Sequence, residues 1–129
     1  MFRIDKKKVF LLYQFYLFEG TQINKIKIDK EEKERFFWLT ECHKNEKYLR
    51  ALISKRLKSG WTFFRLPPLE RAILIFSTYE LLFGRNSNYP KLIIDQVINF
   101  SKAYLEEGKY KYINKVLDLI IKNKDNNYW

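Results

Sequence analysis

Residues 67 to 83 read PPLERAILIFSTYELLF, and this stretch decides the fold. Its two prolines stop the preceding segment and pre-set the first turn of a helix, which Gly84 ends. Apolar side chains recur at helical spacing along one stripe, and two more lie beside it: Leu69, Ala72, Ile73, Phe76, Tyr79 and Phe83, then Ile75 and Leu82. An apolar surface this broad predicts a central helix that packs against neighbours on several sides.

The rest of the chain predicts five further amphipathic helices around this central one. Their expected ranges are residues 4–18, 29–42, 45–60, 90–107 and 109–121. Asp29 and Glu32 are expected to form a capping box for the second helix, and Asn45 to cap the third, which Gly60 closes. No run alternates apolar and polar residues as a half-buried strand would. The sequence therefore predicts an all-α fold of six to seven helices.

Length and composition favour one soluble domain over residues 1–129, with a frayed tail at about 123–129. Cys42 is the only cysteine and His43 the only histidine, so neither an internal disulfide nor a Cys/His zinc site is expected. No apolar run approaches the roughly 20 residues that span a bilayer, and the first 18 residues lack the features of a signal peptide. We therefore expect a cytoplasmic protein without a metal, a cofactor or catalytic residues.

The net charge of +10 comes from 25 Lys and Arg residues against 15 Asp and Glu residues. Such an excess favours a polyanionic partner through long-range attraction and counterion release. A second explanation competes, because abundant Lys, Asn, Ile, Phe and Tyr with scarce Ala is the composition that an AT-rich genome produces. Charge alone leaves a nucleic-acid partner open.

Several ordered motifs resemble those of the NusB family. They are Leu12-Tyr13-Gln14, the stretch RLPPLERAIL at residues 65–74, YELL at 79–82, YPKLIIDQV at 89–97 and YKYINKVLD at 110–118. Tyr89 departs from the pattern, because the family has proline there. Their order and spacing carry the resemblance from residue 1 to about residue 121.

The resemblance implies an all-helical bundle of two three-helix groups and a non-enzymatic RNA-binding factor. Such proteins bind the boxA element of ribosomal RNA together with the ribosomal protein NusE, within the transcription elongation complex. The assembly promotes transcription antitermination and ribosomal RNA synthesis. Some members form homodimers and others do not, and the sequence leaves this open.

The resemblance places six residues at or near RNA: Arg3, Lys6, Lys7, Lys8, Lys111 and Tyr112. Tyr104 and Tyr110 lie close to the last two in sequence and are expected to add ring surface. Lysines bind phosphates as point charges, and tyrosine rings stack on unpaired bases. We expect these groups to share one face. The alternative is that the lysines form a solvated helix end and that the tyrosines merely cover the bundle.

Tyr13 and Glu70 correspond to positions that face NusE, and Arg71 could pair either with that partner or with phosphate. Glu70 could equally serve the dipole of its own helix. Trp61 is expected to fill the junction between the helical groups. Two family glycines are replaced by Leu105 and Lys115, which predicts local repacking near the RNA face.

Two other functions remain in competition. The same kind of domain precedes the catalytic part of certain ribosomal RNA cytosine methyltransferases, which need a glycine-rich cofactor loop and a catalytic cysteine in a further Rossmann-like domain. We expect no such activity, because residues 1–129 contain no such loop. A helical bundle that binds only proteins is the other alternative.

Overall fold

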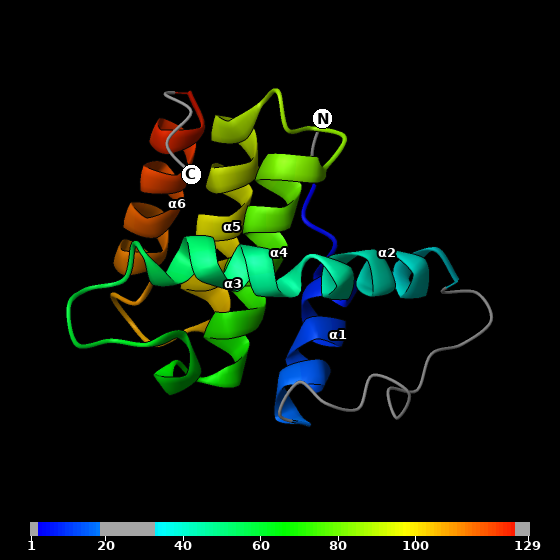
Figure 1. Ribbon diagram of the computed structural model, residues 1–129, viewed down its shortest axis with the longest axis horizontal. Helices are drawn as coiled ribbons and strands as arrows, with labels where there is room; N and C mark the ends of the chain where they lie inside the picture. Colours follow the sequence, from blue (N-terminus) through cyan, green and yellow to red (C-terminus); the bar gives the residue numbers. More distant parts are fainter. Residues whose placement is uncertain (1–2, 19–32, 126–129) are drawn as a thin grey trace.

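The computed structural model describes residues 3–18 and 33–125, and this part of the chain is all-helical, without strands (Figure 1). Six α-helices and one short 3-10 helix follow one another: α1 (Lys6–Leu17), α2 (Lys33–Lys44), α3 (Glu46–Ser54), η3 (Phe63–Arg65), α4 (Pro68–Phe83), α5 (Pro90–Tyr104) and α6 (Tyr110–Asp125). The predicted fold class is thus confirmed. None of the helices in this part of the chain is long and apolar enough to cross a membrane.

Helix α4 is the central element, as its sequence predicts. It packs against α1, α3, α5 and α6. Helix α2 packs mainly against α1 and α3 and reaches α4 through the Trp38 ring. In Figure 1, α4, α5 and α6 run side by side, α3 crosses them, and α2 continues in the direction of α3 across α1. The helices therefore form two sets of three, α1 to α3 and α4 to α6, and α4 joins the sets.

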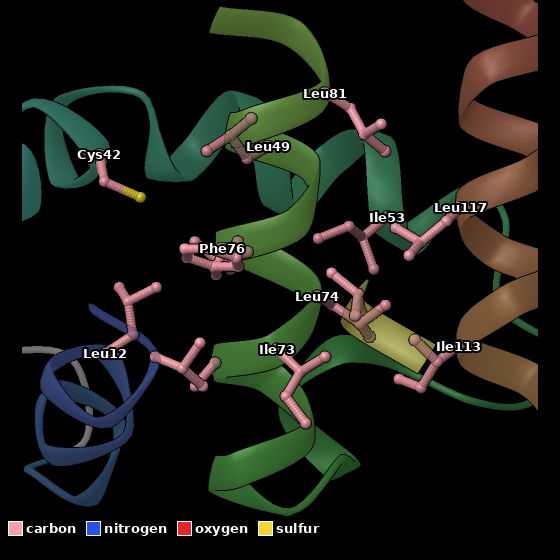
Figure 2. Close-up of a cluster of buried hydrophobic side chains, with 14 of the residues drawn as sticks. Leu12, Cys42, Leu49, Ile53, Ile73, Leu74, Phe76, Leu81, Ile113 and Leu117 are labelled. Atoms are coloured by element: carbon pink, nitrogen blue, oxygen red, sulfur yellow. The ribbon is translucent and has the colours of Figure 1, made fainter. Parts of the chain in front are cut away.

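The core surrounds α4 on several sides (Figure 2). From α4, Ile73, Leu74 and Phe76 are almost fully buried, and Leu12 of α1 and Ile113 of α6 meet them from different directions. Burying a side chain of this size contributes roughly 1.5–3 kcal/mol, so this cluster supplies much of the driving force for folding.

Two buried serines of the core are paired locally. The Ser77 hydroxyl donates to the carbonyl of Ile73 at 2.6 Å, and the Ser101 hydroxyl donates to that of Val97 at 2.8 Å. These bonds return the hydroxyls to their own helices, so neither serine needs a partner elsewhere.

Several local predictions need correction. Asn45 precedes α3 but does not cap it, because its side-chain amide donates backwards to the Glu41 carbonyl at 2.9 Å. Helix α3 ends at Ser54, well before Gly60, whose positive φ of 88° belongs to a turn in the following segment. The expected capping box of Asp29 and Glu32 lies outside the described residues.

Trp61 does not fill the junction between the helical groups. Its side chain is 50% exposed, whereas Phe63 of η3 is 2% exposed and packs its ring 5.7 Å from that of Tyr16. The aromatic residue that enters the core is therefore two positions later than predicted. Helix α6 also continues to Asp125, and the Lys124 ammonium donates to the Leu81 carbonyl at 3.0 Å, so residues 123–125 are helical and not a frayed tail.

Candidate functional site

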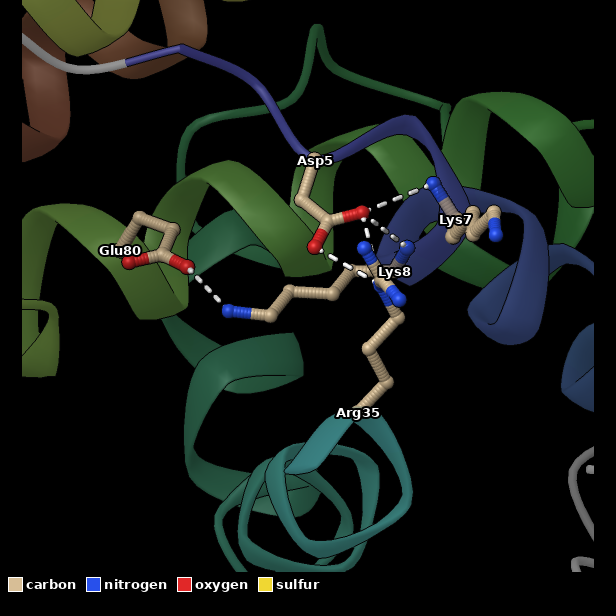
Figure 3. A network of polar contacts seen from close by, with 5 residues as sticks. All are labelled: Asp5, Lys7, Lys8, Arg35 and Glu80. Carbon is tan, nitrogen blue, oxygen red and sulfur yellow. Dashed lines mark hydrogen bonds and ion pairs between the residues drawn. The ribbon is translucent and has the colours of Figure 1, made fainter. Parts of the chain in front are cut away.

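The start of α1 is fixed by a capping carboxylate. One oxygen of Asp5 accepts hydrogen bonds from the backbone N–H groups of Lys7 and Lys8, at 3.1 and 3.4 Å. The same carboxylate pairs with the Arg35 guanidinium of α2 at 2.9 Å (Figure 3). Asp5 thus ends the chain's extended approach, starts the helix and ties it to α2.

Lys8 belongs to this structural network. Its ammonium lies 3.8 Å from a carboxylate oxygen of Glu80 and 5.1 Å from the ring centre of Trp38. Glu80 is 7% exposed, and this burial raises the pKa of its carboxyl. The nearby Lys8 charge acts in the opposite direction and lowers that pKa. Figure 3 shows the Lys8 side chain directed at Glu80, whereas that of Lys7 is directed away from the Asp5 carboxylate.

Lys6 lies beside an aromatic cluster instead. Its ammonium is 5.7 Å from the ring centre of Tyr104, at the end of α5. The Tyr104 ring is 44% exposed; it stacks on Phe100 at 4.4 Å and meets the edge of Phe10 at 5.5 Å. We call these four residues the Lys6–Tyr104 surface. It presents a cation that lies over a half-exposed ring, and Phe100 and Phe10 support that ring.

A second cation and ring pair lies where α5 approaches α6. The Lys102 ammonium is 4.7 Å from the ring centre of Tyr110. Tyr110 is one of the tyrosines that the sequence suggests as added ring surface near RNA. Lys102 was not predicted, because its contact with Tyr110 joins two different helices. The only sequence signal was the clustering of tyrosines and lysines around residues 102 to 112.

Tyr112 and Glu70 are turned toward each other. The Tyr112 hydroxyl donates to a Glu70 carboxylate oxygen, and the Lys109 ammonium lies 3.9 Å from the same oxygen. Burial, reinforced by the Glu70 carboxylate, raises the pKa of the Tyr112 hydroxyl. Because Glu70 is only 5% exposed, its carboxylate serves the contact between α4 and α6.

The other two partner-facing predictions are Tyr13 of α1 and Arg71 of α4. Tyr13 is half-buried and packs against the core. Arg71 lies with its guanidinium 5.2 Å from the ring centre of Tyr16, whose hydroxyl donates to Glu46 at 3.1 Å. Arg71 therefore bridges α4 and α1 through Tyr16.

Arg3 and Lys111 are both exposed. Arg3 lines a cleft of about 930 Å³ with residues of α2 and the end of α4, where acidic and basic side chains are mixed. The predicted RNA residues are thus only partly brought together. Lys6 meets Tyr104, but Lys8 points into the fold and Tyr112 turns toward Glu70.

The described residues hold no group of three or more His, Cys, Asp or Glu side chains that could bind a metal ion. Cys42 is fully buried, and burial raises the pKa of its thiol, which disfavours the reactive thiolate. His43 is exposed, and its ring meets Phe15 edge-on at 5.1 Å. Surface chemistry in this part of the chain is therefore dominated by lysines and aromatic rings.

Comparison with known proteins gives a consistent result. A sequence model described as "NusB family" matches residues 5–122. A transcription antitermination protein NusB of Methylacidiphilum infernorum is 27% identical over 98% of this chain and 94% of its own length. Proteins of the same name from Buchnera aphidicola and Staphylococcus haemolyticus are 33% and 37% identical, over 96% and 76% of this chain and 82% and 77% of their own lengths.

Proposed function

This chain belongs to the NusB family, and we propose that it binds boxA-type RNA together with the ribosomal protein NusE and thereby promotes transcription antitermination. The relatives are named as transcription antitermination proteins, and the expectation of a non-enzymatic factor agrees with those names. The transcription elongation complex is the setting in which such a factor acts.

The observation that carries the proposal is the Lys6–Tyr104 surface. An exposed lysine neutralises a phosphate, and a half-exposed ring offers a plane to an unpaired base. Phe100 and Phe10 hold the Tyr104 ring from two sides, so little side-chain freedom is lost when a base stacks on it. The net charge of +10 adds a long-range attraction for RNA.

NusE would dock along the seam between α1 and α4. Tyr13 offers a partly exposed ring, and Arg71 a guanidinium beside Tyr16. Glu70 contributes indirectly in this proposal, because its buried carboxylate orients Lys109 and Tyr112.

The test is RNA binding by the full chain with and without NusE. Lys6→Gln with Tyr104→Ala should weaken binding of boxA-type RNA by tenfold or more, since stacking on one ring contributes about 1–3 kcal/mol. The matched control is Lys91→Gln with Tyr89→Ala, which removes an exposed lysine and a 64% exposed ring from the start of α5. Equal affinities for the two variants would contradict the proposal.

The partner surface is tested separately. Tyr13→Ala with Arg71→Ala should reduce NusE capture while RNA binding by the isolated chain changes little. A helical bundle that binds only proteins would instead capture NusE and show no affinity for RNA at either low or moderate salt.

A further inference from the structure

We propose that a second groove, between α3 and α6, binds unpaired nucleotides of an RNA strand. The groove encloses about 870 Å³ and is lined by α3, the segment that follows it, the start of α4, and α6. We call it the α3–α6 groove. It uses elements different from those of the Lys6–Tyr104 surface, and it rests on the proposed function in taking RNA as the polyanion and in sharing Tyr112 with the RNA contacts expected from the sequence.

Basic side chains interrupt a lining that is otherwise largely apolar. Lys55, Lys58 and Lys115 are exposed at the groove, and none of them forms an ion pair with a carboxylate of the described residues. Three lysine charges on one concave surface repel each other, and an anion in the groove would relieve that repulsion.

The acidic residue of the lining is already neutralised. The Glu70 carboxylate accepts the Tyr112 hydroxyl and lies 3.9 Å from the Lys109 ammonium. Arg56 is also held by the fold, because its guanidinium donates to the Leu52 carbonyl at 2.7 Å. Because Glu70 and Arg56 are already paired within the protein, the three exposed lysines keep their positive charge available to bind a ligand.

Aromatic surface lies among these charges. Trp61 is 50% exposed at the groove, although a tryptophan is among the residues that gain most from burial. Tyr112 contributes its ring to the lining while its hydroxyl is fixed to Glu70, so the ring is held in one orientation. Leu66 and Val116 are buried at the base of the same groove.

This combination fits RNA better than an acidic peptide. Lysines spaced along a groove neutralise successive phosphates, and the flat indole and phenol rings offer stacking surfaces to bases. An acidic peptide would satisfy the lysines but would leave the indole plane without a flat partner.

The first experiment follows Trp61 fluorescence while a single-stranded oligouridylate is added to the full chain. Trp129→Phe is introduced first, which leaves two tryptophans. Of these, Trp61 is 50% exposed and Trp38 only 9%, so a bound oligonucleotide should quench Trp61. We expect saturable quenching that disappears in Trp61→Phe. Because Trp61 is exposed, this change should leave the helical circular dichroism unchanged. Quenching that persists in Trp61→Phe would overturn the proposal, as would an absence of quenching at low salt.

The second experiment measures the salt dependence of oligouridylate binding. Lys58→Gln with Lys115→Gln should reduce the slope of log affinity against log salt by about 1.4, since each single-stranded phosphate contact contributes about 0.7. The matched control, Lys47→Gln with Lys91→Gln, removes two exposed helical lysines outside the groove and should leave the slope unchanged. Equal slopes for the two pairs would overturn the proposal.

The outcomes separate the two surfaces. If the groove variants weaken binding and the Lys6 and Tyr104 variants do not, the groove stands and the proposed RNA surface fails. The reverse result removes the groove and keeps the proposed function. Quenching of Trp61 by polyglutamate but not by oligouridylate would overturn RNA as the ligand.

Discussion

Lys6 and Lys8 begin the same helix, yet their surroundings differ completely. Lys8 lies against buried Glu80 and the ring of Trp38, within the network that fixes the start of α1. Lys6 lies over the half-exposed ring of Tyr104. Two positions along a helix correspond to a rotation of about 200°, so two residues of one lysine run point to opposite sides. A run of like charges can therefore divide into a structural part and a functional part.

The largest effect on stability is expected in the network that fixes the start of α1 and contains Lys8. Asp5→Ala removes the cap of α1 and the partner of Arg35, and it should lower the free energy of unfolding by about 2 kcal/mol. Asp95→Ala, an exposed position on α5, is the control and should change stability by less than about 0.5 kcal/mol. Urea unfolding of both variants measures the difference, and equal midpoints would mean that the cap contributes nothing.

Lys8→Ala should lower the unfolding free energy by about 1.5 kcal/mol at neutral pH, because it leaves the Glu80 carboxylate buried without its cation. Lys6→Ala should have almost no effect on stability. If both variants unfold at the same urea concentration, the division between the two lysines is wrong.

The pH dependence sharpens this prediction. The folded-state pKa of Glu80 is raised above its ordinary value of 4.5, so the folded state favours the protonated carboxyl. The stabilisation that this raised pKa gives the folded state is fully present below the unfolded-state pKa of Glu80, and it is lost as the pH rises through the folded-state pKa. Glu80→Gln should remove this loss, and Lys8→Ala should enlarge it. The measurement is the unfolding midpoint of wild type and of Glu80→Gln at pH values from 4 upward. If the two midpoints change with pH in the same way, the raised pKa does not belong to Glu80.

Tyr112→Phe tests the same contrast between tyrosines and should affect stability less than Asp5→Ala or Lys8→Ala does. It removes the hydrogen bond to Glu70 and should lower the unfolding free energy by about 1 kcal/mol, while RNA affinity stays within about twofold because the ring remains. Tyr104→Phe should change stability less, since no hydrogen bond of the Tyr104 hydroxyl is described. A loss of RNA binding in Tyr112→Phe without a loss of stability would assign its hydroxyl to RNA.

Much of the fold could be predicted from the sequence, because the helical period of residues 67–83 makes α4 apolar on nearly every side. The prolines and Gly84 placed the limits of α4 and the start of α5 close to where the structure has them. Periodicity was less informative between residues 55 and 67. In that stretch either Trp61 or Phe63 could have been the buried aromatic residue. The structure buries Phe63, because η3 packs its ring against Tyr16.

The candidate site was predicted as a set of residues but not as an arrangement. The sequence named Lys6 and Tyr104, which the structure brings into contact, but it also named Lys8 and Tyr112 as RNA contacts. Those two side chains meet buried carboxylates from α4, and the contacts join residues far apart in the sequence. No local pattern carries that information, so the division of the lysine run could not be predicted.

The most direct test compares Lys6→Gln with Lys8→Gln in the salt dependence of boxA-type RNA binding. If Lys6 contacts a phosphate and Lys8 serves the fold, the first change should reduce the slope by about 0.7 and the second should leave it unchanged. Equal reductions, or a reduction only in Lys8→Gln, would contradict the account.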